Sequence, residues 1–297
     1  MPLEIERIRK STRRVAKFAK RSSKRPSPDE VHKLRTSARH LESALSSLQL
    51  ADERGVGSLL RHLKKIRRLA GALRDMDVLT ANALDIDHRG ERDCLVRLLE
   101  HLGAERSRRA GKLRRMIARK RSKIRRALRR GLERIERARK KPRSAGAALG
   151  VGVLQVSSKL SHPGRLTRNN LHEYRSQVKE LRDALRLSDR TAHSTLVRKL
   201  EDVKGAIGDW HDWVELTDIA VDVLDHRPSC ALVKRLETSR DSKYRHALSL
   251  THTLIARHLR PKRRKRPKRT AGKAPIATPV LEAVAAIAHD GDPERAH

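Results

Sequence analysis

Two stretches of the chain place a histidine and several cations at regular spacing along a predicted helix. In the first stretch, His32, Arg35 and Arg39 each follow an apolar or small residue by one position. Since successive residues lie about 100° apart around a helix, these side chains form a row beside the buried face. Imidazole and guanidinium groups donate hydrogen bonds to anionic oxygen atoms, so this row is suited to binding phosphate groups.

A second row with the same spacing occurs later in the chain. Its members are His172, Arg175, Lys179, Arg182 and Arg186. A run of cations on one helix face is ordinarily a solvated surface, but its repetition at matched positions favours a binding function. If the two copies pack symmetrically, the two rows line a shared groove.

The rows belong to an internal repeat of the sequence. Val31 and His32 correspond to Leu171 and His172 at an offset of 140 residues. The next predicted helix recurs at an offset of 137 residues, with Gly71 matching Gly208. The difference between the offsets fits a change in loop length, so we predict an internal duplication. The repeat adds these candidate cations: Arg61, Arg67, Arg74, Arg198 and Lys204.

The elements that position these residues are predicted to be helices, because the apolar periodicity is helical almost throughout. Aromatic residues make up only 2% of the chain, so Leu, Ile, Val and Ala must build most of the core, which suits an all-α fold better than a β-sandwich. Trp210 and Trp213 are expected in the core of the second copy. Predicted helices cover residues 5–22, 58–84, 91–141 (as one helix, or as two broken near Ser122) and 147–160.

Capping residues predict where the row-bearing helices begin. Ser27 is suited to be an N-cap before Pro28, and Glu30 completes a capping box. Thr167 is the corresponding N-cap in the second copy.

Turn, linker and tail signals divide the chain into segments. Turns are expected at Gly55, Gly57 and residues 162–164, and a linker at residues 142–146. These signals bound a first copy over about residues 3–141 and a second over about 147–260. Beyond Pro261 a basic run precedes a segment rich in proline and small residues, so residues 261–297 are predicted to be a disordered tail.

The formal net charge of +36, from 71 Lys and Arg against 35 Asp and Glu, opposes a compact state unless anions neutralise it. Nucleic acid, polyphosphate and acidic lipid are the candidate partners. No apolar run approaches the roughly 18 residues of a membrane span. The N-terminal segment lacks the apolar region of a signal peptide. Cys94 and Cys230 lie far apart, with no disulfide framework and no metal-ligand spacing, so a reducing cytoplasm is expected.

Other functions remain open for the histidines and for two carboxylates. His32 and His172 are also suited to be helix-start residues, whereas metal binding is disfavoured because no second ligand lies at suitable spacing beside either. Asp75 and Asp212 offer acid–base chemistry or Mg²⁺ binding, but pairing with neighbouring Arg or Lys is the favoured interpretation.

The repeated segments resemble the CHAD family, the conserved histidine α-helical domain. The resemblance rests on residues 31–35 with Arg39, on 171–175 with 179–182, and on the pair 71–75 and 208–212, and it covers about residues 3–260. It implies two four-helix bundles related by pseudo-twofold symmetry, whose basic helices face a central cleft that holds polyphosphate. It also implies binding without catalysis or cofactor, and association with polyphosphate granules in some members.

The repeat and the resemblance together predict the polyphosphate-binding residues. They are His32, Arg35, Arg39, Arg61, Arg67, Arg74, His172, Arg175, Lys179, Arg182, Arg198 and Lys204. The second copy departs from the first where Glu201 and Asp202 occupy the positions of Lys64 and Lys65, which weakens its contribution from this helix.

The alternative function is RNA or DNA binding by a basic helical protein, which the net charge and the tail support. The tail is expected to add only weak nucleic-acid binding. An enzyme is disfavoured because the sequence has no phosphate-binding Gly-x-x-x-x-Gly-Lys-Ser/Thr loop, no carboxylate cluster for two metals and no nucleophile with a poised base.

Overall fold

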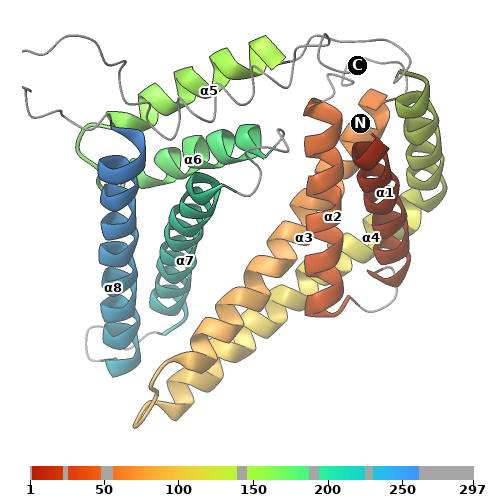
Figure 1. Cartoon of the computed structure of the whole chain (residues 1–297). Coiled ribbons are helices and arrows are strands. Elements are labelled where there is room, and N and C mark those ends of the chain that lie inside the picture. The colour runs from red at the N-terminus through yellow and green to blue at the C-terminus, as the bar shows by residue number, and fades with distance from the viewer. Residues whose placement is uncertain are drawn as a thin grey trace, which may run out of the picture. The chain divides into compact units, whose positions relative to one another are not determined.

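The computed structural model describes residues 2–22, 26–47, 56–138, 146–186, 194–224 and 230–260. These residues form eight α-helices and no strands, so the predicted all-α class is confirmed (Figure 1). None of the helices among them combines the length and the apolar character that crossing a bilayer requires. The predicted tail at 261–297 and most of the predicted linker lie outside the described residues.

The chain divides into two compact units. Unit 1 comprises residues 1–142 and 215–236, and unit 2 comprises residues 143–214 and 237–297. Two long helices, α7 (Thr195–Val223) and α8 (Ala231–Leu254), therefore contribute residues to both units.

Unit 1 is built around a four-helix bundle. Its helices are α1 (Pro2–Ser22), α2 (Pro28–Ser47), α3 (Val56–Asp85) and α4 (Arg92–Ala138). Contacts join α1 to α2, α2 to α3, α3 to α4 and α4 back to α1, so the four helices enclose one core. That core is aliphatic, as the composition predicted, and its members include Val15, Leu34, Leu41, Leu63, Ile66 and Ile117.

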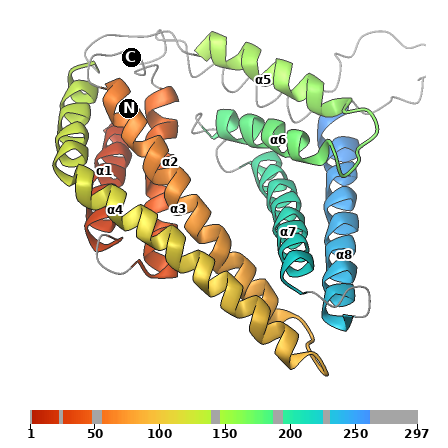
Figure 2. The ribbon, with the colours of Figure 1, turned by 180° about the vertical axis from the view of Figure 1, so that it is seen from behind.

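Helix α4 is one continuous helix of 47 residues. The sequence left open whether this basic stretch is one helix or two, and the structure shows no break near Ser122. Figure 2 shows the helix bending along its length. Its first part packs along α3 while its later residues, such as Ile124 and Leu128, join the core beside α1.

Unit 2 also has a core to which four helices contribute. Helices α5 (Gly146–Ser161) and α6 (Leu171–Leu185) pack with parts of α7 and α8, and α8 continues into a π-helical turn at Ile255–Leu259. All five predicted core positions of α6 are buried: Leu171, Tyr174, Val178, Leu181 and Leu185. Trp210 and Trp213 are buried as predicted. That the two bundles arose by duplication stays a prediction.

The predicted helix starts are confirmed in unit 1 and wrong in unit 2. The Ser27 hydroxyl accepts a hydrogen bond from the Glu30 amide at 3.3 Å, so Ser27 is the N-cap of α2. Thr167 does not cap α6. Its amide instead donates to Asn170 Oδ1 at 2.8 Å, which fixes a turn, and Asn170 precedes the first residue of α6.

Of the turns predicted at glycines, one is confirmed and one is wrong. Gly164 has a φ of +67°, which confirms the predicted turn at 162–164. Gly57 lies inside the first turn of α3, so the predicted turn there is wrong, and Gly55 lies outside the described residues. Gly90, with a φ of +79°, makes the turn between α3 and α4.

Helix α3 offers a matched test of the unit 1 core. Leu63 is fully buried, whereas Leu84 of the same helix is 59% exposed. Leu63→Ala should lower the free energy of unfolding by about 2–5 kcal/mol, because it removes buried methyl groups and leaves a cavity. Leu84→Ala should change it by about 0.5 kcal/mol or less. Urea denaturation followed by circular dichroism measures both, and equal effects would contradict the described core.

Candidate functional site

The clearest contact among the predicted site residues joins Arg35 to Gly71. Arg35 is half-buried on α2, and its side chain crosses to α3. A Cβ atom at position 71 would lie 3.4 Å from Arg35 Nε and 4.0 Å from its Cδ. The glycine therefore leaves the space in which the guanidinium lies against the backbone of α3.

The same contact occurs in unit 2, between Arg175 of α6 and Gly208 of α7. A Cβ atom at position 208 would lie 3.0 Å from Arg175 Nη2, which is closer than a side chain tolerates without displacement. Arg175 Nε also donates a hydrogen bond to the Lys204 carbonyl at 3.2 Å. The repeat predicted these arginines and glycines as corresponding pairs, and the structure brings each arginine to its own glycine.

The two histidines are exposed near the starts of α2 and α6. His32 lines a hollow of about 250 Å³ with Arg14 of α1, and Lys33 and His40 of α2 also line it. The His172 ring lies 5.4 Å from the ring of His211 on α7, measured between centroids. Each histidine thus has a basic or imidazole neighbour on another helix, which sequence spacing did not reveal.

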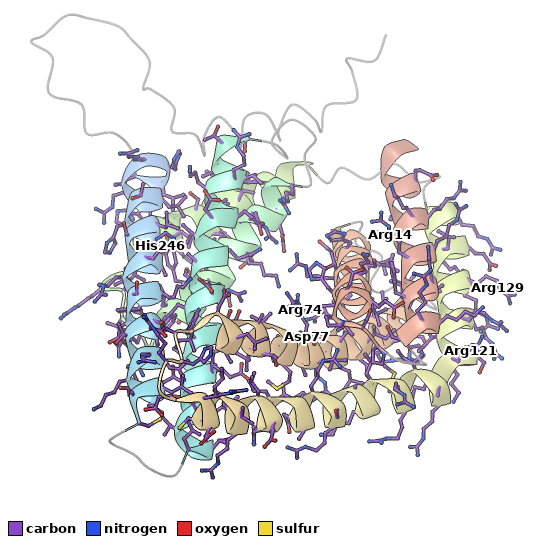
Figure 3. All side chains as sticks on the ribbon, turned by 90° about the horizontal axis from the view of Figure 1, so that it is seen from below. Arg14, Arg74, Asp77, Arg121, Arg129 and His246 are labelled. Carbon is purple, nitrogen blue, oxygen red and sulfur yellow. The ribbon has the colours of Figure 1, made fainter. Side chains whose placement is uncertain are left out.

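The remaining predicted cations differ in how accessible they are. Arg61, Lys179 and Arg198 are exposed, and Arg39 and Arg74 are half-buried. Figure 3 shows Arg74 projecting from α3, and it labels Arg14, Arg121 and Arg129 on the other helices of unit 1. Arg67 is half-buried and forms an ion pair with Glu42.

Arg182 was predicted in the accessible row, and the structure shows that this is wrong. Its side chain is only 1% exposed. The guanidinium donates to Asp183 and to Glu201 Oε2, the latter at 2.5 Å, and Glu201 also pairs with Lys204. Arg182 directly follows the core residue Leu181 and is itself buried beside α7. A buried charge is costly unless it is paired, so the guanidinium requires these carboxylates.

The charges at this position are exchanged between the units. By the repeat, Arg182 corresponds to Glu42, and Lys204 corresponds to Arg67. Unit 1 therefore has an acid–base pair where unit 2 has two bases, and Glu201 lies between those bases as their shared acceptor. Partial burial acts to raise the pKa of Glu201, but the hydrogen bond from Lys204 and the charge of Arg182 together lower it. Glu201, which was expected to weaken the contribution of the second copy, neutralises the charges of Arg182 and Lys204.

Burial and, after it, nearby cations lower the pKa of two further histidines. Burial, and then the charges of Lys120, Arg61 and Lys123, lower the pKa of His62 on α3. Burial, and then Lys199 and Arg257, lower the pKa of His258 in unit 2. Cations from α4 therefore lie near the predicted Arg61. These cations were not predicted as site residues, because the basic stretch of α4 has no matched copy in the repeat.

A separate cluster lies where α4 and α8 begin. Cys94 and Cys230, which lie far apart in the sequence without metal-ligand spacing, are both buried. Their sulfur atoms and a carboxylate oxygen of Glu91 lie within 4.8 Å of one another. Burial, then the hydrogen bond to Glu91 and the nearby Cys230, raise the pKa of Cys94 to about 12. Ligand spacing read along the chain could not reveal this cluster, because it depends on tertiary structure.

The sequence matches the CHAD domain family over residues 6–221. This match covers more than half of the chain, and the chain therefore belongs to the CHAD domain family, as the repeated histidine and arginine segments indicated. A search of curated proteins found no significant match.

The buried Arg182 provides a test of the unit 2 arrangement. Glu201→Gln should lower the free energy of unfolding by about 1–3 kcal/mol, because a buried guanidinium loses an anionic acceptor. Glu180→Gln, at an exposed position of α6, is the control and should change it by about 0.5 kcal/mol or less. Thermal and urea denaturation followed by circular dichroism compare the two variants. If both are as stable as the parent, Arg182 does not depend on Glu201.

Proposed function

We propose that this protein binds inorganic polyphosphate without catalysing a reaction on it. CHAD domains are associated with polyphosphate binding, and the net charge of +36 calls for a polyanionic partner. Membership of the family supports the class of ligand, and the side-chain geometry within each unit supports the residues.

The observation that carries the proposal is the arginine–glycine contact that occurs once in each unit. Arg35 and Arg175 are half-buried guanidinium groups that lie against a glycine of the neighbouring helix. Such groups lose less conformational freedom on binding than fully exposed side chains. A guanidinium also donates two parallel hydrogen bonds to one phosphate group, so both arginines are suited to contact a phosphate chain.

The proposed site combines these arginines with exposed and half-buried basic residues, of which Arg67 and Lys204 also form ion pairs with Glu42 and Glu201. Its residues are His32, Arg35, Arg39, Arg61, Arg67, Arg74, His172, Arg175, Lys179, Arg198 and Lys204. Arg182 is assigned a positioning role instead, because it is buried and held by Asp183 and Glu201. That the two rows face one cleft, and that the protein resides in polyphosphate granules, stay predictions.

Polyphosphate is favoured over nucleic acid by what the chain offers to a ligand. Single-stranded nucleic acid binds on exposed aromatic side chains that stack on its bases, whereas only 2% of these residues are aromatic and both tryptophans are buried. A chain of phosphates has no bases, so charge-assisted hydrogen bonds and charge density suffice to recognise it. CHAD domains are also generally non-catalytic, in agreement with a binding function.

Replacing both arginines tests the proposal. Arg35→Ala with Arg175→Ala should weaken polyphosphate binding at least about tenfold, since each charge-assisted hydrogen bond contributes about 1.5–3 kcal/mol. Arg119→Ala with Arg245→Ala removes the same charge from exposed positions of α4 and α8, and should weaken it only slightly. Fluorescence anisotropy with labelled polyphosphate measures affinity, and circular dichroism checks helicity. Equal losses in the two double variants would show that net charge alone binds the ligand.

A competition separates polyphosphate from nucleic acid as the ligand. Unlabelled polyphosphate should displace the labelled chain at lower concentration than RNA of matched total charge. Both affinities should fall steeply as salt rises, because binding releases counterions. If RNA competes equally well, the nucleic-acid alternative takes first place.

Removal of the predicted tail tests whether the helical units suffice. A chain that ends at Arg260 should keep its preference for polyphosphate over RNA and lose mainly general nucleic-acid affinity. The run at 262–269 is almost entirely basic and has no apolar periodicity, so it attracts any polyanion without selecting one. The same competition measures this preference. Loss of polyphosphate binding with unchanged helicity would place the site in the tail instead.

A further inference from the structure

Three ligand-type side chains from two segments of unit 1, the starts of α4 and α8, lie close together. Glu91 immediately precedes α4, Cys94 is in the first turn of α4, and Cys230 immediately precedes α8. One oxygen of Glu91 and the two sulfur atoms lie within 4.8 Å of one another, and both cysteines are buried. Among the described residues, these are the three His, Cys, Asp or Glu side chains that gather closely enough to share an ion.

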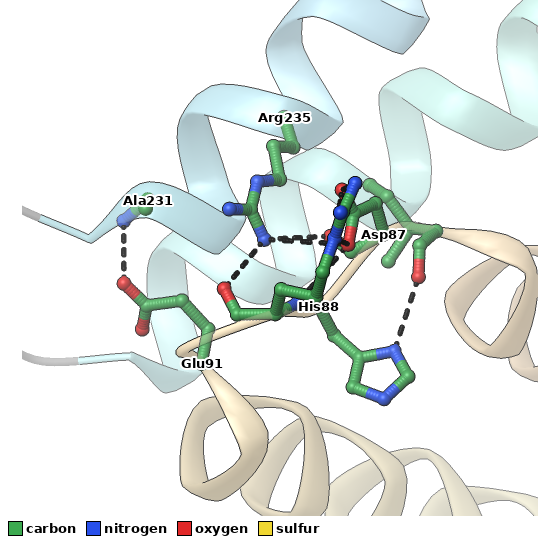
Figure 4. Close-up of polar contacts among 7 residues, drawn as sticks. Asp87, His88, Glu91, Ala231 and Arg235 are labelled. Carbon is green, nitrogen blue, oxygen red and sulfur yellow. Dashed lines mark hydrogen bonds and ion pairs between the residues drawn. The ribbon is translucent and has the colours of Figure 1, made fainter.

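The Glu91 carboxylate is oriented by two different hydrogen bonds. Its Oε1 accepts the backbone N–H of Ala231 at 3.0 Å, and its Oε2 accepts the Cys94 thiol at 3.0 Å. Figure 4 shows the first of these bonds joining Glu91 to the start of α8. One oxygen is therefore occupied by the backbone, and the other is directed toward the sulfur atoms.

The turn before α4 is also fixed to α8. Arg235 donates hydrogen bonds to the carbonyl oxygens of Asp87 and Arg89, at 2.9 and 3.0 Å (Figure 4). These contacts hold the segment that carries Glu91 against the helix that follows Cys230. The three side chains thus converge on a backbone that other bonds already hold in place.

The ligand set defines the kind of ion. Two thiolates and one carboxylate suit a borderline-soft divalent ion such as Zn²⁺, whereas Mg²⁺ and Ca²⁺ take oxygen ligands. Two sulfur atoms on a tetrahedral Zn²⁺ lie about 3.8 Å apart, since each Zn–S bond is about 2.3 Å. Separations within 4.8 Å reach that geometry through small side-chain movements.

The local electrostatics also suit such an ion. Three anionic ligands leave a charge of −1 around a divalent ion, in a buried place where an uncompensated charge is costly. Both cysteines lie at helix N-termini, whose partial positive charge offsets part of the negative charge that the three ligands leave around the ion. Arg235 lies in the next turn of α8 and adds a full positive charge nearby.

A disulfide fits this arrangement less well. Oxidation removes the thiol proton that Cys94 donates to Glu91 Oε2. The partly buried carboxylate would then face sulfur lone pairs without a donor, which is unfavourable. A cation on the two sulfur atoms satisfies the same oxygen.

We infer that Glu91, Cys94 and Cys230 form a binding site for a thiophilic divalent cation of the zinc class. The ion takes the place of two thiol protons, and water completes its tetrahedral coordination. It joins the start of α4 to the start of α8. This inference does not depend on polyphosphate binding.

Cobalt substitution tests the site on the full chain. The protein is reduced, stripped with a chelator and titrated with Co²⁺, without polyphosphate because that polymer itself chelates cations. One equivalent should produce sulfur-to-cobalt charge-transfer absorption in the near ultraviolet, and Zn²⁺ should abolish it. The 15 histidines do not confuse this signal, because imidazole ligands give no sulfur charge transfer.

Variants identify the ligands. Cys94→Ser and Cys230→Ser should each remove the absorption. Glu91→Gln keeps an oxygen acceptor for the Ala231 amide but loses the anionic ligand, so Co²⁺ affinity should fall about tenfold or more. Glu100→Gln, at an exposed position of α4, should leave the affinity unchanged. Circular dichroism shows which variants fold.

A measurement of cysteine alkylation in the parent protein tests the site even if a variant fails to fold. In the parent protein, Zn²⁺ should slow alkylation of both cysteines, which the intact mass reports over time. Absence of charge transfer and of protection would overturn the inference. A purified protein that holds a Cys94–Cys230 disulfide and, once reduced, binds no Co²⁺ would overturn it as well and identify a redox pair.

Discussion

Repulsion among cations is the constraint on which the rest of this structure depends. The chain has 71 basic and 35 acidic residues. Cations that are partly buried between helices repel one another strongly, so carboxylates are needed beside them. The side chain of Asp77 is 4% exposed and pairs with Arg106, whereas that of Glu42 is 17% exposed and pairs with Arg67. These two carboxylates thus neutralise cations between helices. Under the proposed function, a bound polyanion would neutralise part of the surplus positive charge and stabilise the fold.

The helices meet this constraint with aliphatic cores and with glycines at close approaches. Gly71 and Gly208 let the guanidinium groups of Arg35 and Arg175 lie against the neighbouring helix. A Cβ atom at position 208 would displace the Arg175 guanidinium, whereas one at position 71 would lie 3.4 Å from Arg35 Nε, at the edge of ordinary van der Waals contact. A glycine within a helix costs about 1 kcal/mol relative to alanine. The position of Arg175 explains this cost at Gly208.

Much of the fold could be predicted because it depends on periodicity and local capping. The all-α class, the start of α2 at Pro28 and the core line of α6 all follow from side chains within one helical turn of each other. The prediction that Thr167 caps α6 was wrong because a local turn, closed by the hydrogen bond from the Thr167 amide to Asn170, lies there instead. The prediction that Arg182 is accessible was wrong because its burial depends on how closely α7 packs on α6, which the sequence of α6 alone does not show. The proximity of Cys94 and Cys230 could not be predicted, because no spacing along the sequence shows that the starts of α4 and α8 lie close together.

Cations whose side chains are fixed by contacts with the protein differ in their effect on binding from mobile cations at the surface. Arg175 lies against Gly208 and donates a hydrogen bond to the backbone carbonyl of Lys204, so the backbone of α7 fixes its position. Glu201 of the same helix pairs with the side chains of Lys204 and Arg182. Free cations raise the rate of encounter with every polyanion, whereas supported ones favour a ligand whose oxygen atoms match their positions. In the proposed site, any selectivity for polyphosphate would therefore come from arginines such as Arg175, whose positions the neighbouring helix fixes.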